Sequence, residues 1–195
     1  MARKIDEDKI KRIKEATMKT IVDFGIESTT IAMIAKNANV SGGYLYRTYS
    51  GKQELINELF YEKVIALNNE LTFLLSLNPT SIQPLLKTFI ANRIVYFINE
   101  PTASNFFYQL LHNDNFKLTG DLKQSVVNMM QKIKSIGIKS GEISEKITLF
   151  NLYFYILIYP VDYIHFKRKN IFESNVINTN DITSLTSTIL NILKN

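Results

Sequence analysis

The sequence predicts an all-α protein in which an N-terminal three-helix domain is joined by a long helix to a C-terminal helical bundle, about nine helices in total. Apolar residues recur at helical spacing through most of the chain, and no stretch alternates apolar and polar residues as strands do. Glycine occurs only 7 times in 195 residues. All four prolines lie beyond residue 78, so nothing interrupts the helical pattern before that point.

The first predicted helix carries one apolar stripe and ends at a glycine. Gly25 stands where a helix C-cap is expected, because glycine adopts the left-handed backbone that ends many helices. The stripe consists of Ile10, Ile13, Thr17, Ile21 and Phe24.

Two short helices follow, at residues 30–38 and from residue 41 onward. Asn39 stands between them, and asparagine is one of the few residues besides glycine that tolerates a left-handed backbone. Ser41 can cap the second helix, and Ala35 is small enough to let the two helices approach closely. The pattern predicts a helix-turn-helix.

The charges around this motif favour a polyanionic partner. No acidic residue lies between Ser28 and Gln53, whereas basic residues do. Ser50 and Gln53 fit a capping box, which would place Lys52 in the first turn of a helix, where a cation opposes the helix dipole. A DNA phosphate at that position would explain Lys52. Close approach of DNA would likewise explain Gly42 and Gly43, which each cost a helix about 1 kcal/mol.

Longer amphipathic helices are expected over the rest of the chain. The predicted domains are a helix-turn-helix domain at residues 1–53 and an effector-binding and dimerisation domain at residues 54–195, with the boundary inside a helix rather than in a linker. The predicted helices cover residues 52–77, 81–99, 102–113, 121–136, 144–166 and 181–193.

Residues 10–60 resemble the DNA-binding domain of the TetR family of bacterial regulators. Three positions depart from the family pattern: Asn39 replaces the usual turn glycine, Gly42 a longer side chain, and Tyr49 the usual phenylalanine. The residues that carry the resemblance are Thr30, Ile34, Ala35, Ala38, Val40, Ser41, Gly43, Leu45, Tyr46, Tyr49, Lys52, Glu54 and Leu55.

The resemblance implies a ligand-responsive transcriptional repressor that binds a pseudo-palindromic operator in double-stranded DNA as a homodimer. Ser41, Gly42 and Tyr44 would face the major groove, with Gly43 beside them. Glycine offers no side chain to a base edge, so Tyr44 or Arg47 would compensate for Gly42, or specificity would depend on DNA shape. The phosphate contacts would come from Thr30, Tyr46, Thr48 and Lys52.

The resemblance also implies an effector pocket in the C-terminal bundle and a dimer interface made by the last two long helices. The aromatic composition favours a small apolar or aromatic effector, because residues 89–109 hold little charge beyond Arg93 and Glu100. The candidate pocket residues are Phe89, Arg93, Tyr96, Phe97, Phe107, Tyr108, Met129, Phe150 and Phe154.

Other functional classes find little support. The chain has no cysteine and two histidines, which argues against thiolate or clustered metal sites, and no cofactor is expected. It lacks the G-x-S-x-G and P-loop patterns, so we expect no enzyme. The N-terminus is charged, and the apolar run 147–159 is shorter than a membrane span, so we expect a cytoplasmic protein without a membrane partner. Two alternatives remain: an all-helical small-molecule or lipid carrier or enzyme, and a constitutive DNA-binding protein without an effector.

Overall fold

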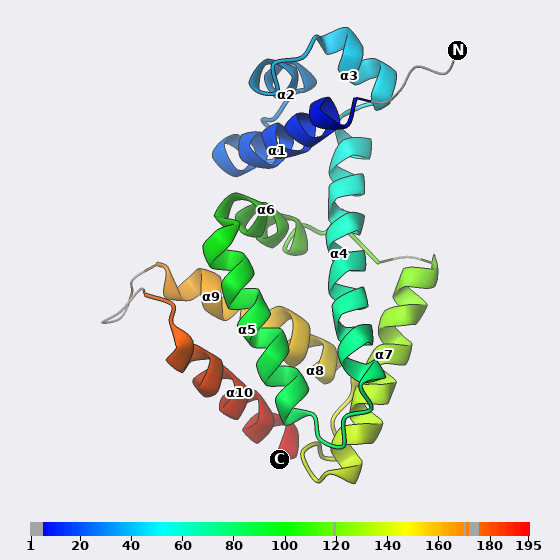
Figure 1. Ribbon diagram of the computed structural model, residues 1–195, viewed down its shortest axis with the longest axis vertical. Coiled ribbons are helices and arrows are strands. Elements are labelled where there is room, and N and C mark those ends of the chain that lie inside the picture. The colour runs from blue at the N-terminus through cyan, green and yellow to red at the C-terminus, as the bar shows by residue number, and fades with distance from the viewer. Residues whose placement is uncertain (1–5, 119, 170, 172–175) are drawn as a thin grey trace. The chain divides into compact units, whose positions relative to one another are not determined.

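The computed structural model describes residues 6–118, 120–169, 171 and 176–195, and all regular secondary structure within these residues is helical (Figure 1). Because α8, the π-helical turn η1 and α9 follow one another without a break, they form one helix, and the described residues contain nine helices as predicted. The elements are α1 (Glu7–Phe24), α2 (Ile31–Asn37), α3 (Gly42–Thr48), α4 (Lys52–Ser76), α5 (Gln83–Asn99), α6 (Pro101–Leu111), α7 (Gly120–Lys139), α8 (Leu149–Tyr153), η1 (Phe154–Ile158), α9 (Tyr159–Lys167) and α10 (Thr179–Lys194).

The chain forms two compact units. The first comprises Met1–Val64 and Glu100–Phe116, and the second comprises Ile65–Asn99 and Lys117–Asn195. The boundary between Val64 and Ile65 falls inside helix α4, so the first half of this helix belongs to the first unit and the second half to the second. The division of roles at residues 53 and 54 stays a prediction, because compactness does not show which part binds DNA or an effector.

The first unit is held together by contacts of α1 with α2 and α6. Phe60 on α4 stacks on Phe107 of α6 with ring centres 6.0 Å apart. The ring centre of Phe116 lies 5.3 Å from that of Phe60. The amine of Lys14 on α1 forms ion pairs with two carboxylates of α4, Glu58 at 2.7 Å and Glu62. The N-terminal half of α4 is therefore fixed by both aromatic packing and charge.

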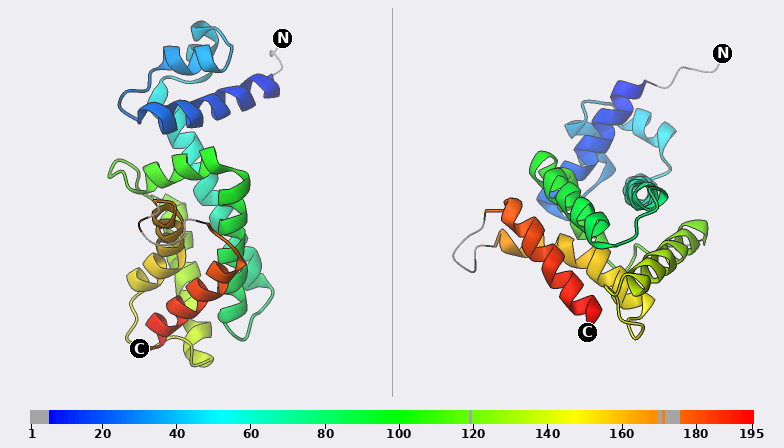
Figure 2. Two further views of the ribbon diagram at one scale, coloured as in Figure 1. Left: turned by 90° about the vertical axis from the view of Figure 1, so that its left-hand side faces the viewer. Right: turned by 60° about the horizontal axis from the view of Figure 1, so that its bottom comes forward.

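In the second unit, α5 packs against α9 and α10, as the two views of Figure 2 show. Leu86, Phe89 and Ile90 of α5 are each at most 1% exposed, and Leu185 and Ile189 of α10 are equally buried. These side chains belong to a continuous apolar core that also includes residues of α4, α7, η1 and α9.

The N-terminus of α5 is capped by a carboxylate from a distant loop. Glu142 accepts hydrogen bonds from the Ser81 hydroxyl at 2.7 Å and from the N–H groups of Ile82 at 2.7 Å and Gln83 at 3.1 Å. Burial raises the pKa of Glu142, but hydrogen bonds, the largest from Ser140, outweigh burial and lower it below the ordinary value. The cap joins segments 60 residues apart.

The helix predicted at residues 144–166 begins later, at Leu149, where the Thr148 hydroxyl caps it by accepting from the Asn151 N–H at 3.1 Å. Within it, Phe154–Ile158 forms a π-helical turn that the sequence pattern does not predict. The N–H of Tyr159 donates to the carbonyl of Phe154, and Pro160 follows with no N–H to donate. The α-helical hydrogen-bond pattern is therefore interrupted next to Pro160, which has no N–H to continue it.

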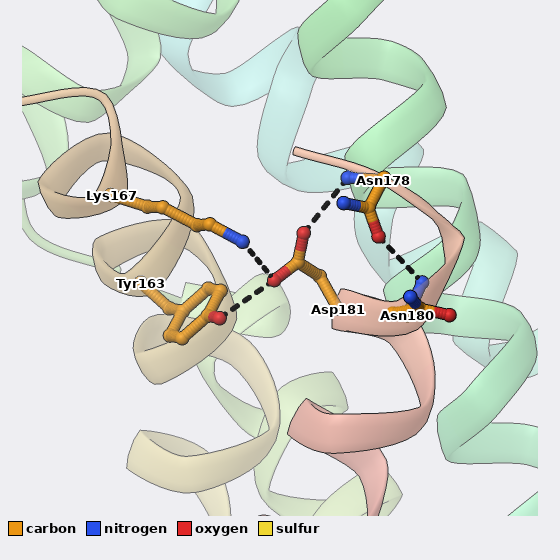
Figure 3. A network of polar contacts seen from close by, with 5 residues as sticks. All are labelled: Tyr163, Lys167, Asn178, Asn180 and Asp181. Carbon is orange, nitrogen blue, oxygen red and sulfur yellow. Dashed lines mark hydrogen bonds and ion pairs between the residues drawn. The ribbon is translucent and has the colours of Figure 1, made fainter. Parts of the chain in front are cut away.

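Helix α10 is anchored to α9 through the buried carboxylate of Asp181 (Figure 3). This carboxylate accepts from the Tyr163 hydroxyl at 2.7 Å and from the Asn178 N–H at 2.8 Å, and it pairs with Lys167. Asn178 in turn caps the helix, so that Asn178 and Asp181 form a capping box. The start of α10 is thus fixed by charge, by a phenol and by its own cap.

Within the described ranges, no helix combines the length and the apolar character needed to cross a membrane. The same residues hold no group of three or more histidine, cysteine, aspartate or glutamate side chains placed to bind a metal ion.

Candidate nucleic-acid interface

The turn between α2 and α3 has the geometry that its residues predict. Asn39 adopts a positive φ of 52°, which confirms the left-handed position expected of the turn residue. The N–H of Val40 then donates to the carbonyl of Ala35 at 3.0 Å. Ala35 and Ala38 are buried, and their small side chains allow the two helices to approach. The helix-turn-helix is therefore formed as predicted.

Two of the predicted DNA-contacting side chains also cap helices. Ser41 caps α3 by accepting from the Tyr44 N–H at 3.2 Å, as expected. Thr30 caps α2 in the same way, accepting from the Met33 N–H at 3.2 Å. Both residues are exposed, so capping leaves their outer surfaces accessible.

Helix α3 separates an inward from an outward face. Leu45 within α3 and Tyr49 immediately after it are 0% and 4% exposed and belong to the core. Arg47 and Thr48 are exposed, and Tyr46 projects with 63% of its surface exposed. An exposed tyrosine beside an arginine is suited to contact a phosphate backbone and base edges together.

Tyr44 lies near two cations. The amine of Lys9, near the start of α1, is 5.4 Å from the centre of the Tyr44 ring, and the guanidinium of Arg47 is 6.0 Å from it. Lys9 also pairs with Asp6 at 2.8 Å. Lys9 could not be identified from the sequence, because it lies 35 residues before Tyr44 and meets its ring only in the folded protein.

Within the part of the chain that the structure describes, nothing requires glycine at positions 42 and 43. A Cβ atom added at either position would meet no heavy atom within 4 Å. Neither residue has a positive φ. Each glycine therefore destabilises the helix by about 1 kcal/mol relative to alanine, and no contact within the fold compensates for this loss.

Lys52 has a structural role that its sequence position does not reveal. Its amine donates to the carbonyl oxygens of Ile26 at 2.7 Å and Glu27 at 3.4 Å, in the loop after α1. Protein carbonyls therefore also account for the Lys52 amine at this helix N-terminus, and a DNA phosphate is not needed to explain it. A phosphate contact by the remaining N–H group stays a prediction.

The predicted capping box between Ser50 and Gln53 is not formed, because Ser50 is bonded to a different residue. Glu54, one residue further on, accepts from the Ser50 N–H at 2.5 Å and from its hydroxyl at 2.7 Å. These two hydrogen bonds lower the pKa of Glu54 below its ordinary value. The amide of Gln53 instead donates to Asn57 at 3.0 Å, one turn along α4.

The hydroxyl of Tyr49 distinguishes this chain from the family pattern, in which phenylalanine is usual. Burial and the negative charge of the neighbouring Glu58 carboxylate raise the pKa of Tyr49 to about 12. Glu58 also pairs with Lys14 at 2.7 Å, so the phenol of Tyr49 lies near the contact between α1 and α4.

The nine candidate effector residues are divided between the two units. Phe89, Phe97 and Met129 are buried in the core of the second unit. Phe107 and Tyr108 belong to the first unit, where Tyr108 packs on His112 with ring centres 4.5 Å apart. The remaining four lie in the second unit: Arg93 nearly buried, Tyr96 half-buried, Phe154 36% exposed and Phe150 73% exposed.

A groove of about 360 Å³ opens on the surface of the second unit. None of the nine candidate residues lines it. Its walls come from the end of α7 and the start of α8, namely Gln131, Lys134, Ser135, Ile138, Lys139 and Leu149. Lys134 also donates to the carbonyl of Glu145 at 2.9 Å.

Comparison with known proteins supports this interpretation of the N-terminal region. The sequence model of the family described as bacterial regulatory proteins, tetR family, matches residues 13–59. An uncharacterised HTH-type transcriptional regulator of Bacillus subtilis (strain 168), YhgD, is 42% identical over 53 residues. That match spans 27% of this chain and 28% of the relative.

Solved structures share the fold over nearly the whole chain. A TetR family transcription regulator from Marinobacter aquaeolei VT8 aligns with a TM-score of 0.72 at 17% identity, over 95% of both chains. The transcriptional regulator FadR from Bacillus subtilis, solved with stearoyl-CoA, aligns with a TM-score of 0.66 at 18% identity, over 94% of this chain and 96% of its own. Residues 13–59 therefore match the bacterial regulatory proteins of the tetR family, and the all-helical fold of the chain is that of solved TetR family regulators.

Proposed function

We propose that this protein is a transcriptional repressor that binds a pseudo-palindromic operator as a homodimer and releases it when a small apolar or aromatic effector binds within residues 54–195. The observation that carries the proposal is the outward face of α3. Tyr46 and Arg47 are exposed there. They follow two glycines that the fold does not require, in a stretch without acidic residues.

The contacts proposed for DNA fall into two groups. Ser41, Gly42, Gly43, Tyr44 and Arg47 would face the major groove, where side chains and close backbone approach read base edges and shape. The phosphate contacts would come from Thr30, Tyr46, Thr48 and Lys52, whose roles position the protein rather than select a sequence.

A homodimer is supported by apolar surface on the α8–η1–α9 helix. Phe150 is 73% exposed, and its ring stacks on that of Phe154 with ring centres 6.5 Å apart. Two adjacent exposed phenylalanines are uncommon on the surface of a monomer and are typical of association surfaces. We therefore place the two-fold interface on this helix and α10, the last two long helices.

An apolar effector is supported by the composition of the second unit and by one structural relative. The core of that unit is lined by apolar and aromatic side chains. FadR from Bacillus subtilis has the same fold and was solved with stearoyl-CoA, a ligand with a long apolar chain. We propose a ligand of similar apolar character for this chain, and no enzymatic activity.

Duplex binding at different salt concentrations tests the function. A high-affinity duplex is first selected from a random pool, and its affinity is then measured by fluorescence anisotropy. We expect the logarithm of the affinity to fall linearly with the logarithm of salt concentration, with a slope set by the number of phosphate contacts. A carrier would show no duplex selection and no salt-dependent binding, and that result would contradict the proposal.

A further inference from the structure

One ion pair joins α4 to α5 inside the second unit. The guanidinium of Arg93 on α5 pairs through Nη2 with Oε2 of Glu70 on α4, and the two side chains are only 10% and 21% exposed. The side-chain amide of Asn92 donates to the other oxygen of Glu70 at 2.9 Å. Both carboxylate oxygens of Glu70 are therefore used.

The guanidinium of Arg93, in contrast, is not fully used. Its Nε is buried and has no hydrogen-bond partner among the described residues. The guanidinium lies 4.8 Å from the centre of the Phe89 ring, which is 1% exposed. Burial lowers the pKa of Arg93, and the charge of Glu70 opposes that change. A cation held against an apolar core with a spare buried donor is a costly arrangement that an acceptor oxygen would relieve.

The geometry of arginine indicates which acceptor fits. A carboxylate can accept from Nε and Nη2 of one guanidinium at the same time, which is stronger than the single contact that Glu70 makes. The surroundings, Phe89 and the apolar core, suit an alkyl or aryl group attached to that carboxylate.

We propose that Arg93 binds the carboxylate of an amphipathic effector, which replaces Glu70 as the partner of the guanidinium. This inference rests on the proposed function for the role of the ligand as an effector and adds its chemical class. Because Glu70 lies on α4, the exchange removes an ion pair that ties α4 to α5. Helix α4 starts at Lys52, beside the helix-turn-helix, so the exchange acts on the element that carries both sites.

Binding of decanoate and of decanol, which differ only in the head group, tests the proposal. Calorimetric titrations are made with the full-length wild type, with Arg93→Gln and with Glu70→Gln. Lys87→Gln is the matched control, because it removes a positive charge from the exposed side of the same helix. Circular dichroism confirms that each variant is folded.

We expect the wild type to prefer decanoate over decanol by about tenfold or more, as a charge-assisted hydrogen bond would give. Arg93→Gln should abolish this preference, and Lys87→Gln should keep it. Glu70→Gln should bind decanoate more tightly than the wild type, because the competing carboxylate is gone. A purely structural ion pair predicts no gain, so Glu70→Gln decides the matter even if Arg93→Gln fails to fold.

Equal affinities for decanoate and decanol, no decanoate binding, or no gain in Glu70→Gln would overturn the assignment. Selection of duplex DNA by the same preparation distinguishes this failure from failure of the proposed function. If duplex binding persists without a carboxylate preference, only the ligand class is wrong. If the preference is present without duplex binding, the ligand site stands and the repressor function falls.

Discussion

The amine of Lys52 donates to two carbonyl oxygens in the loop after α1, so its removal affects both stability and DNA binding. We expect Lys52→Ala to lower the free energy of unfolding by about 1 to 2 kcal/mol, as the loss of hydrogen bonds from a charged group does. If the amine also contacts a phosphate, the slope of log affinity against log salt should become shallower by about 1. Urea denaturation and anisotropy at several salt concentrations measure the two effects separately.

Lys36→Ala is the control for that experiment, because Lys36 is exposed on α2 and has no predicted phosphate contact. An unchanged salt slope in Lys52→Ala, measured on fully folded protein, would show that the lysine only holds the loop.

Gly43 offers a prediction in which stability and function move in opposite directions. A Cβ at this position meets nothing within 4 Å, so Gly43→Ala should raise the free energy of unfolding by up to about 1 kcal/mol. The added methyl group stands where we propose close approach of DNA, so operator affinity should fall. Thermal denaturation and anisotropy measure the pair of effects.

Gly137→Ala is the matched contrast, since a Cβ at that buried site would collide with the side chain of Ile143. That variant should lose stability. An unchanged operator affinity in Gly43→Ala would contradict the proposed approach of DNA to α3.

Residue roles that depend on local backbone geometry could be predicted from the sequence. Asn39 and Gly25 have positive φ, and Ser41 caps α3, because turn and capping preferences act within a few residues. The partners of Lys52 could not be predicted, since they lie 26 and 25 residues away and meet it only in the folded protein. The partner of Ser50 was misidentified because Gln53 and Glu54 are both within reach of it.

At the scale of elements, the Asp181 network predicts how α10 is held. Asp181→Asn removes the charge that pairs with Lys167 and weakens the contact with Tyr163. We expect a loss of roughly 2 kcal/mol in the free energy of unfolding at neutral pH, because the carboxylate is buried and accepts charged and neutral donors.

The pH dependence of that loss identifies its electrostatic origin. Burial raises the pKa of Asp181, but hydrogen bonds from Lys167, Asn178 and Tyr163 outweigh burial and lower it below 3.8. A lowered folded-state pKa gives stability that is present above the unfolded value and lost as pH falls through the folded value. The difference between wild type and Asp181→Asn should therefore be constant above about pH 5 and shrink below about pH 4. A difference that stays constant down to pH 3 would assign it to packing alone.

The helices themselves could be predicted closely, whereas one irregularity could not. The predicted ends of α4 and α5 lie within two residues of those observed, because proline and turn residues mark them. The start of α8 was placed five residues too early. The π-helical turn at Phe154–Ile158 was missed, since a uniformly apolar run carries no signal that separates one helical hydrogen-bond pattern from another.

At the scale of the whole molecule, the dimer prediction depends on which apolar side chains remain exposed. Ile156 and Ile189 lie on the two helices of the proposed interface, yet they are 1% and 0% exposed within one subunit. Charged substitutions there would unfold the subunit and would not test association. Phe150, exposed and stacked on Phe154, is the appropriate site.

We expect the wild type to sediment as a dimer at micromolar concentration and Phe150→Asp to sediment as a folded monomer. Phe73→Asp, at a 63% exposed residue of α4 outside the proposed interface, should remain dimeric. A monomeric wild type would contradict the homodimer, and a dimeric Phe150→Asp would move the interface elsewhere.

The arrangement of aromatic residues shows where prediction from sequence ends. Phe89 and Phe150 are both aromatic residues on largely apolar helices, but one is 1% and the other 73% exposed. The run 147–159 around Phe150 is apolar nearly all round, so its sequence does not distinguish the inner side from the outer. The helix-turn-helix, with its short amphipathic helices and its turn residues, carries that information locally, so its geometry could be predicted and that of an effector pocket could not.

Induction makes a thermodynamic prediction that holds whatever the effector is. Helix α4 begins at Lys52 and places Leu71 and Leu75 in the core of the second unit, so a ligand that shifts this core acts on the helix leading to the DNA-binding motif. A dimer reads two half-sites only when its recognition helices are about 34–36 Å apart, one turn of DNA. A hundredfold loss of operator affinity requires the ligand to favour the state that cannot bind DNA by about 2.7 kcal/mol.

By reciprocity, operator DNA must weaken ligand binding by the same factor. The measurement is a calorimetric titration of an effector, identified by thermal-shift screening, into the free dimer and into the dimer–operator complex. We expect affinities that differ by the factor by which the ligand lowers operator affinity. Equal affinities would exclude induction through α4, because a ligand that binds two states equally cannot shift the equilibrium between them. The protein would then bind its operator constitutively, and the C-terminal helices would serve association alone.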